Sequence, residues 1–191
     1  MTHCNTPMIL ASRSPRRREL LAEAGYHFKV VPPENDVEPE ASPGEDPADY
    51  VARLAETKAR DVATQIGAGL IIACDTVAEC DGRILGKPET ADDARRMLEL
   101  LSGREHRVLT GLCLRNVTSG EAKTRVAVTT LRMDPLTAEQ IAEYVRSGLW
   151  EGKAGGFGYQ DRLGWIHIID GSPSNVVGLP LELLAEMLAQ G

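Results

Sequence analysis

Residues 70–76 read Leu-Ile-Ile-Ala-Cys-Asp-Thr, and this stretch decides the expected fold. The apolar run from Leu70 to Cys74 is typical of a central strand whose two faces are both covered. Asp75 follows directly, and in α/β sheets ligands gather at the carboxyl ends of such strands. We therefore expect Asp75 to end the strand and to serve as a proton acceptor or a ligand for a divalent metal. A polar residue that only terminates the strand is the alternative.

Strand-like and helix-like patterns alternate on both sides of this run, which predicts an α/β fold. Further strands are expected over residues 8–11, 27–31, 77–80, 83–85, 105–115, 122–131 and 165–169. Helices are expected over residues 14–25, 46–65, 90–103, 137–147 and 180–189. Because the chain has no internal repeat and no long linker, we expect residues 1–191 to form a single domain. Its mixed twisted sheet should be flanked by helices and divided into two lobes around a cleft.

The composition is that of an acidic globular protein. The 191 residues include 21 Lys and Arg and 28 Asp and Glu, a net charge of −7, and aromatic residues make up 4%. A long nucleic acid needs a basic surface, and unpaired bases need exposed rings, so we exclude long nucleic acid as a partner. A small anion can still bind where cations gather locally in a cleft.

Neither a membrane span nor a secretory signal is expected. The longest apolar stretch is too short for a bilayer, and the N-terminal MTHCNTPMIL lacks a charged segment followed by a long apolar one. Cys4, Cys74, Cys80 and Cys113 show no metal-binding spacing, so we expect free thiols. These features predict a cytoplasmic protein with no membrane partner.

Three consecutive arginines follow Ser14 and Pro15 at the expected start of a helix. A helix N-terminus favours acidic side chains, so arginines oppose its dipole unless an anion binds at the same place. Helical spacing puts Arg16 and Arg17 on the inward side and turns Arg18 toward solvent. Guanidinium groups bind phosphate with paired hydrogen bonds, which predicts a phosphate site; a basic surface patch is the alternative.

Two lysines are candidates for the same anion site. Lys58 lies in the apolar stripe of the helix expected over residues 46–65, beside Leu54 and Val62. One interpretation is a side chain that extends along the edge of the stripe to solvent, and the other is an ammonium group that projects into a cleft to meet phosphate or carboxylate. Lys87 follows a short expected strand and would complete a cationic pocket.

A glycine-rich segment, Lys153-Ala-Gly-Gly-Phe-Gly-Tyr-Gln160, matches neither the Walker nor the Rossmann pattern. Closely spaced glycines allow the backbone to come near a ligand or another segment. The Gln160 amide both donates and accepts hydrogen bonds, so it can read the edge of a base. A flexible bulge or a tight chain crossing is the alternative.

Six segments in order are ASRSPRRREL, RLAETKA, ACDT, LGKP, KAGGFGYQ and NVVGLPL. Over residues 8–184 the chain thereby resembles the Maf family of nucleoside triphosphate pyrophosphatases. The resemblance implies an α/β fold with a cleft between two lobes, related to inosine triphosphate pyrophosphatases. It also implies a cytoplasmic homodimer with a divalent metal, Mg²⁺ or Mn²⁺. The implied reaction cleaves a nucleoside triphosphate between its α and β phosphates, giving the monophosphate and pyrophosphate.

The resemblance assigns roles to residues by their position. Asp75 matches the proton acceptor. Positions that discriminate between substrates are matched by Arg16, Thr76 and Gln160. Phosphate-contacting or catalytic positions are matched by Arg17, Lys58 and Lys87, and Ser14 belongs to the same phosphate-facing loop.

The KAG-x-x-G-x-Q pattern that ends at Gln160 resembles the branch of the family that acts on dTTP and UTP. We therefore expect these two substrates, with modified pyrimidine nucleotides as further ones. Two alternatives stay open: a 7-methyl-GTP pyrophosphatase, and a non-catalytic nucleotide-binding regulator of cell division.

One position departs from the family's pattern. Many members carry an acidic pair in the loop after the second strand, where this chain reads Glu34-Asn-Asp-Val-Glu38. Val37 stands in the place of the second acid. We expect Asp36 or Glu38 to substitute for it in the metal site, together with Asp75; a shift of the loop's register by one residue is the alternative. The replaced acid is also the feature that favours the non-catalytic alternative.

Overall fold

The computed structural model describes residues 7–35 and 39–190. Its strands are β1 (Met8–Leu10), β2 (Phe28–Val30), β3 (Leu70–Cys80), β4 (Arg83–Leu85), β5 (Glu105–Asn116), β6 (Ala122–Met133) and β7 (Ile166–Asp170). Its helices are α1 (Pro15–Glu23), α2 (Pro47–Gln65), α3 (Ala91–Leu101), α4 (Ala138–Arg146), α5 (Pro173–Val177) and α6 (Leu181–Ala189). Two 3-10 turns, η1 (Ala154–Gly156) and η2 (Tyr159–Asp161), lie in the glycine-rich segment. The strands form one mixed sheet in the order β2-β1-β3-β5-β6-β7, and β4 also pairs with β3.

Most predicted elements are confirmed, because their caps are encoded locally. Thr90 and Thr137 each form a capping box at the start of α3 and α4, and Asp46 accepts a hydrogen bond from the first turn of α2. The helix α5 and the 3-10 turns are not predicted, since a five-residue helix has too little periodicity to recognise in a sequence.

The prediction that a strand ends at Cys74 is wrong. The strand β3 continues to Cys80, so Asp75 lies inside it. The reason is pairing: β5 runs antiparallel to β3 along nearly its whole length and supplies partners on both sides of Asp75. The opposite edge of β3 is interrupted instead, because β1 pairs with residues 70–72 and β4 with residues 78–80. On that edge, between β1 and β4, no strand of the described chain pairs with residues 73–77.

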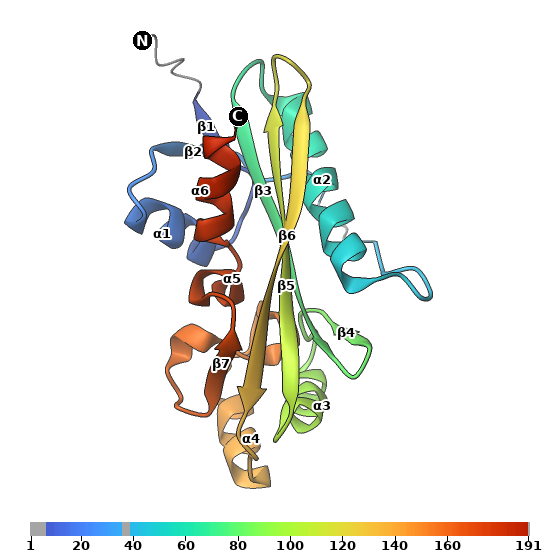
Figure 1. Ribbon diagram of the computed structural model, residues 1–191. Helices are drawn as coiled ribbons and strands as arrows, with labels where there is room; N and C mark the ends of the chain where they lie inside the picture. The colour runs from blue at the N-terminus through green and yellow to red at the C-terminus, as the bar shows by residue number, and fades with distance from the viewer. Residues whose placement is uncertain (1–6, 36–38, 191) are drawn as a thin grey trace.

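Helices cover both faces of the sheet in the upper half of the molecule (Figure 1). On one face Ala59 and Val62 of α2 pack on Ile71. On the other face Leu21 of α1 and Leu184 of α6 pack with Ile72. Because neighbouring β3 side chains point to opposite faces, coverage of both faces explains the continuous apolar run.

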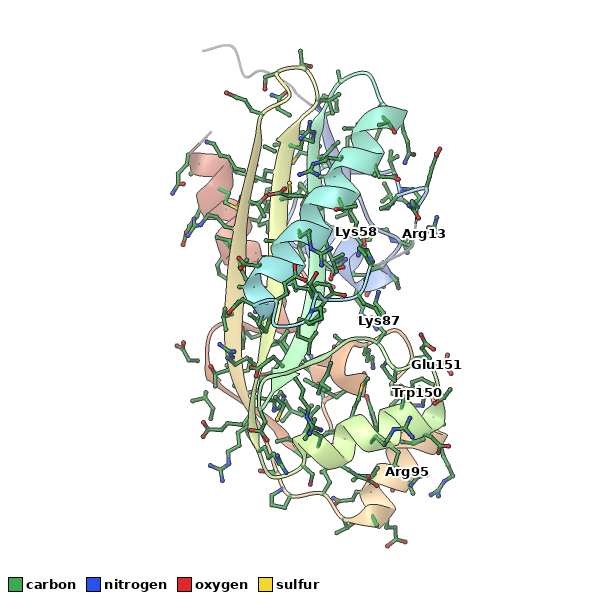
Figure 2. All side chains as sticks on the ribbon, turned by 90° about the vertical axis from the view of Figure 1, so that its right-hand side faces the viewer. Arg13, Lys58, Lys87, Arg95, Trp150 and Glu151 are labelled. Carbon is green, nitrogen blue, oxygen red and sulfur yellow. The ribbon has the colours of Figure 1, made fainter. Side chains whose placement is uncertain are left out.

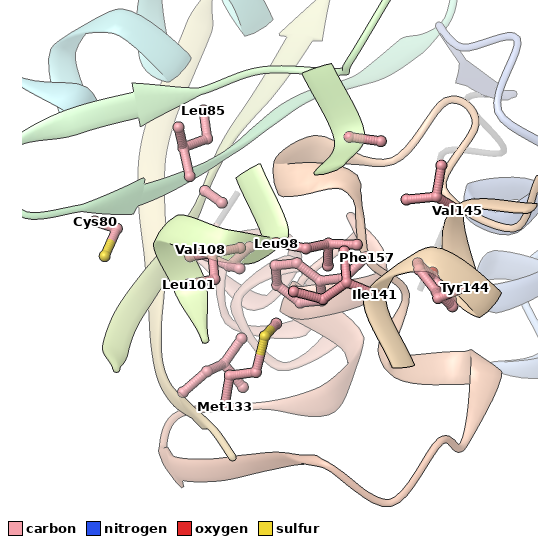
Figure 3. Packing of buried hydrophobic residues seen from close by; sticks show 13 residues of the cluster. Cys80, Leu85, Leu98, Leu101, Val108, Met133, Ile141, Tyr144, Val145 and Phe157 are labelled. Atoms are coloured by element: carbon pink, nitrogen blue, oxygen red, sulfur yellow. The ribbon is translucent and has the colours of Figure 1, made fainter. Parts of the chain in front are cut away.

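The lower half of the molecule has its own core (Figure 3). Leu98 of α3 and Ile141 of α4 pack there with Met133, and Phe157 joins them from the glycine-rich segment. The strands β3, β5 and β6 run through both halves, as Figure 1 shows. The predicted α/β sheet with two lobes is therefore confirmed.

The described cysteines agree with the expected free thiols. Cys74, Cys80 and Cys113 are buried and form no disulfide, whereas Cys4 lies outside the described residues. Burial raises the pKa of the Cys74 thiol to about 12, so it stays uncharged in the core. Every helix in the described part of the chain is too short or too polar to span a bilayer.

A glycine allows α2 to lie unusually close to the sheet. Gly111 of β5 is the direct partner of Asp75 and faces α2. A Cβ atom built on Gly111 would lie 2.3 Å from the carbonyl oxygen of Val51 and 2.8 Å from the nitrogen of Ala52. Backbone atoms of a packed helix cannot yield as the tip of a side chain can. Any side chain at position 111 would therefore push α2 away from the Asp75 region of the sheet.

We expect Gly111→Ala to lower the free energy of unfolding by about 1–3 kcal/mol, the usual range for overpacking a core. Urea unfolding followed by circular dichroism measures the change. Gly67→Ala is the matched control, because a Cβ there meets no heavy atom within 4 Å. This control should stay within about 0.5 kcal/mol of the original protein. Equal stability of the two variants would contradict the close approach of α2.

Candidate active site

A cavity of about 450 Å³ opens at the interrupted edge of β3, between the two lobes. It is lined by all the described residues that the sequence predicts for catalysis or substrate binding: Ser14, Arg16, Arg17, Lys58, Asp75, Thr76, Lys87 and Gln160. The other two predicted residues, Asp36 and Glu38, lie outside the described residues. The volume is that of an ordinary small-molecule site.

The cavity is cationic although the chain carries a net charge of −7. Its basic lining residues are Arg13, Arg16, Arg17, Lys58, Lys87 and Lys153, and its acidic ones are Asp75 and Glu151. Figure 2 shows Arg13 and Lys58 on the upper lobe and Lys87 and Glu151 on the lower one. The local cluster of cations that a small-anion site requires is therefore present, and a polyanion is the ligand class that its charge fits.

Asp75 and Lys58 form a buried ion pair in this cavity. The side chain of Asp75 is 5% exposed and that of Lys58 15%. Of the two interpretations of Lys58, the second is confirmed: the ammonium group projects into the cleft and meets a carboxylate. Each charge offsets the desolvation of the other, and removing one would leave the other buried without its counterion.

Arg17 connects α1 to the rest of the site. Its Nε donates to the Gly178 carbonyl at 2.7 Å, its Nη1 to the Cys74 carbonyl at 2.9 Å and its Nη2 to Thr76 Oγ1 at 3.0 Å. The Cys74 carbonyl belongs to the interrupted edge of β3, so the guanidinium supplies a donor where a neighbouring strand is missing. Neutral oxygens accept all three bonds, which leaves the positive charge of Arg17 in the cavity wall. Its contact with phosphate stays a prediction.

Thr76 extends this connection across the sheet. Its Oγ1 lies 2.9 Å from Oγ1 of Thr110, which donates to the Asn175 carbonyl at 3.3 Å. A hydroxyl has one proton, so Thr110 accepts from Thr76 while Thr76 accepts from Arg17. The resulting chain of hydrogen bonds ties α1, β3, β5 and α5 together beneath the cavity.

The N-terminus of α1 faces the cavity as predicted. Ser14 caps it, with Oγ accepting from the backbone N–H of Arg17 at 3.4 Å. Arg16 and Arg17 are partly buried and Arg18 is exposed, which confirms their expected orientation. Arg16 Nη2 donates to the Gly152 carbonyl at 2.5 Å. Burial, helped by the charge of Arg17, lowers the pKa of Arg16.

The glycine-rich segment forms the lower wall of the cavity. The Gly155 N–H donates to the Gly86 carbonyl at 2.9 Å, which joins the segment to the loop that carries Lys87. Gly155 has φ +70°, a left-handed conformation that favours glycine, and a Cβ there would lie 2.9 Å from Cβ of Ala78. A tight chain crossing, one of the predicted alternatives, is therefore confirmed. The same segment also places Gln160 at the cavity.

A second cavity, of about 690 Å³, adjoins the first. The two share Arg16, Gln160 and Val177 as lining residues. The second also has apolar walls, formed by Leu20 and Ile166. Two of the residues that the resemblance connects with substrate discrimination, Arg16 and Gln160, thus stand where the two cavities meet.

The described residues fit a divalent metal whose ligands come mostly from a bound phosphate and water, with few from the protein. Within residues 7–35 and 39–190 no cluster of three His, Cys, Asp or Glu side chains forms a complete metal site. One buried carboxylate, that of Asp75, lines the cavity beside the cations. Mg²⁺ is commonly bound by one or two carboxylates with phosphate and water oxygens in its other positions.

The acidic loop is attached to α2 on both sides of residues 36–38. Before them, Asp61 of α2 accepts a hydrogen bond from the Glu34 N–H at 2.8 Å. After them, Glu45 accepts from Arg53 Nε at 2.8 Å. The hydrogen bonds from Arg53 lower the pKa of Glu45 to about 2, so this carboxylate stays charged and attached.

Sequence reasoning missed two cations of the cavity, Arg13 and Lys153, and one acid, Glu151. Arg13 directly precedes Ser14, the cap of the helix whose N-terminus is predicted to bind phosphate. This position next to the cap could have identified Arg13 as a further cation of the site. Lys153 opens the recognised glycine segment, but nothing in the sequence indicates that its partner is Asp161, at 2.6 Å. Such a pairing depends on how the glycines fold, which short-range patterns do not encode.

Comparison with known proteins places the chain in a family. The family model for Maf-like protein matches residues 7–191. The chain belongs to the Maf-like protein family. This Maf-like chain is 50% identical over 182 residues to the dTTP/UTP pyrophosphatase of Rhodopirellula baltica, an alignment that covers 95% of this chain and 80% of that protein. It is 43% identical over 185 residues to the dTTP/UTP pyrophosphatase of Thermococcus onnurineus, covering 96% and 97% respectively.

A solved structure shows the same fold as this Maf-like protein. The HAM1 protein from Coxiella burnetii superposes with a TM-score of 0.53 and 18% sequence identity, over 97% of this chain and 100% of that one. At this identity the likeness concerns the fold alone. It confirms the architecture that the sequence predicts.

We expect the Lys58–Asp75 pair of this Maf-like protein to show strong energetic coupling. Lys58→Met should lower the free energy of unfolding by about 3–5 kcal/mol, because the Asp75 charge loses its buried partner. Adding Asp75→Asn should recover at least about 1 kcal/mol of that loss. Urea unfolding of both single variants and the double variant measures the coupling.

The control for this cycle is the exposed Arg60–Glu56 pair on the same helix, at 2.8 Å. Arg60→Met should cost no more than about 0.5 kcal/mol, since solvent screens a surface pair. Additive effects of Lys58→Met and Asp75→Asn would show that the two side chains do not interact in solution.

Proposed function

We propose that this Maf-like protein hydrolyses dTTP and UTP, and modified pyrimidine nucleotides, to the monophosphate and pyrophosphate. The observation that carries the proposal is the cavity at the interrupted edge of β3. It gathers six basic side chains around one buried carboxylate in a chain of net charge −7. A compact polyanion with a small organic part suits such a cavity better than a neutral ligand or a long nucleic acid. The names of the relatives from Rhodopirellula baltica and Thermococcus onnurineus support the choice of dTTP and UTP.

The proposed reaction uses the residues around Asp75. Asp75 accepts the proton of a water molecule whose oxygen forms a bond to phosphorus while the bond to the pyrophosphate oxygen breaks. Lys58 orients the Asp75 carboxylate, and Lys58 and Lys87 bind the charge that develops on the phosphate oxygens. The guanidinium groups of Arg16 and Arg17 and the N-terminus of α1 hold the triphosphate in place. Such fixed positive charge is usually the largest contribution to catalysis of this kind.

A divalent metal, Mg²⁺ or Mn²⁺, is part of the proposal. Asp75 and either Asp36 or Glu38 would hold it, and when bound it would neutralise phosphate charge. Two facts support this set of ligands. Asp75 lines the cavity, and Pro33, three residues before Asp36 in the sequence, lines it as well.

A cytoplasmic homodimer is the setting that we propose for this activity. The resemblance to the Maf family supports both parts. Free, buried thiols at Cys74, Cys80 and Cys113 are in keeping with a reducing compartment.

Pyrophosphate release across a panel of triphosphates tests the proposed function. The panel contains dTTP, UTP, 5-methyl-UTP and 7-methyl-GTP at equal concentration, with Mg²⁺ or Mn²⁺. We expect the highest kcat/KM with dTTP and UTP. Asp75→Asn keeps the shape of the side chain but removes the proton acceptor, so its kcat should fall at least about 10²-fold.

The control is Asp170→Asn, an exposed residue at the end of β7 that should retain the original kcat. A preference for 7-methyl-GTP would move the protein to the other branch of the family. Nucleotide binding without pyrophosphate release would identify a regulator. Undiminished turnover in Asp75→Asn would reject the role of Asp75.

Gln160→Ala tests how the base is selected. The amide of Gln160 should hydrogen-bond the edge of the pyrimidine, and each lost bond costs about 1–3 kcal/mol. We therefore expect the ratio of kcat/KM for dTTP to that for GTP to fall at least about fivefold. An unchanged dTTP-to-GTP ratio of kcat/KM would show that the base is selected by other residues.

A further inference from the structure

A second buried ion pair lies in the lower lobe, away from Asp75. Lys153 Nζ is 2.6 Å from Oδ1 of Asp161 and 2.5 Å from its Oδ2, and both side chains are 8% exposed. Lys153 precedes η1 and Asp161 ends η2, so the pair closes the glycine-rich segment into a loop. Neither residue belongs to the mechanism proposed above. A buried pair of this kind usually fixes one geometry more than it stabilises the fold.

The loop is shaped to make this contact. A Cβ on Gly158 would lie 2.6 Å from Lys153 Nζ and 2.6 Å from Asp161 Oδ2. The ion pair therefore packs directly against a backbone position that has no side chain. Gly155 and Gly156, with φ of +70° and +71°, turn the chain so that its two ends meet. The glycines therefore make room for the ion pair as well as shaping the wall of the cavity.

A third side chain holds the pair from outside the loop. The hydroxyl of Tyr144, on α4, donates to Asp161 Oδ2 at 2.7 Å. The Tyr144 ring packs edge-on against Trp165, with ring centres 5.5 Å apart (Figure 3 shows Tyr144 in the lower core). Burial raises the pKa of Tyr144, so it remains a hydroxyl and a donor at any physiological pH. The Asp161 carboxylate is thus held both by Lys153, next to η1, and by Tyr144 of α4.

The loop closed by this pair carries Gln160 and contacts Arg16, two of the three residues that line both cavities. Gln160 immediately precedes Asp161 in η2. Arg16 donates to the carbonyl of Gly152, which immediately precedes Lys153, and the negative charge of Asp161 also acts on Arg16. One end of the loop therefore places Arg16 and the other end places Gln160.

We propose that Lys153, Asp161 and Tyr144 form a positioning network that sets the placement of Gln160 and Arg16 and thereby the choice of nucleotide base. The inference rests on the proposed function, because it concerns the substrate of that site. Lys153 lines the charged cavity, but its Nζ lies within hydrogen-bond distance of both oxygens of the Asp161 carboxylate. Its charge is therefore compensated by the protein, and it acts through the loop without binding phosphate.

The test separates selection of the base from binding of phosphate. Asp161→Asn keeps the shape but removes the charge that holds Lys153, and Tyr144→Phe removes only the hydroxyl bond. For both variants we would measure kcat and KM with dTTP and GTP. We would also measure the inhibition constant of inorganic tripolyphosphate, which has phosphates and no base. Thermal melting shows whether each variant is folded.

We expect Asp161→Asn to raise KM for dTTP about tenfold, with kcat changed less than about threefold, since a small displacement of positioning groups has effects of this size or larger. The dTTP-to-GTP ratio of kcat/KM should fall by a similar factor. The inhibition constant of tripolyphosphate should rise less than about threefold, because the network places Arg16 but not Arg17, Lys58 or Lys87. Tyr144→Phe should change the same quantities in the same direction by a smaller factor. Asp170→Asn and Arg146→Ala, exposed residues of β7 and α4, are the controls and should match the original protein.

Two results would overturn the positioning network. One is an unchanged dTTP-to-GTP ratio in Asp161→Asn that is folded. The other is a rise in the tripolyphosphate inhibition constant equal to the rise in KM, which would place Lys153 in the phosphate site. If the original protein releases no pyrophosphate at all, the proposed function fails separately. The network is then judged by dissociation constants for dTTP, GTP and tripolyphosphate from calorimetry, with the same expected pattern.

Discussion

The cleft depends on an interruption in the pairing of one strand. The strand β5 follows β3 along nearly its full length, but the opposite edge of β3 carries β1 only to Ile72 and β4 only from Ala78. An unpaired edge exposes backbone groups that need partners, and Arg17 supplies one of them to the Cys74 carbonyl. Because β1 leads into α1 at this point, the helix N-terminus arrives at the same gap. The site is therefore a consequence of how a parallel and an antiparallel strand share one edge.

The charges around the cleft fall into two classes. Lys153 is paired with the buried carboxylate of Asp161, which takes no part in the proposed reaction, so Lys153 contributes little net charge to a ligand. Arg16 and Arg17 donate to carbonyl and hydroxyl oxygens, which fix their orientation without cancelling their charge. The Lys153–Asp161 pair thus sets geometry, while the guanidinium groups supply positive charge to an incoming polyanion. This division agrees with the preference of arginine for planar, paired recognition of phosphate.

The sequence was sufficient for the features that local patterns encode. Caps and periodicity predicted most helices. The lysine within an apolar stripe left two interpretations open, and the structure confirms the one in which Lys58 enters a cleft. The end of the strand at Cys74 was predicted wrongly, because the continuation of β3 depends on its pairing with the distant β5. The approach of α2 over Gly111 and the Lys153–Asp161 pair were invisible for the same reason. Each depends on contacts between segments whose relative placement no short pattern determines.

A cationic cavity inside an acidic molecule also limits which anions can bind. At physiological ionic strength the field of surface charges is screened within about 8 Å, so the overall charge of −7 neither attracts nor strongly repels a distant nucleotide. The basic side chains act only on a ligand that has entered the cavity of about 450 Å³. A nucleoside triphosphate can bring all its phosphates into that volume. Most of a long polynucleotide would stay outside the cavity, against a protein whose net charge is negative. Exclusion by size and attraction by charge therefore select the same class of ligand.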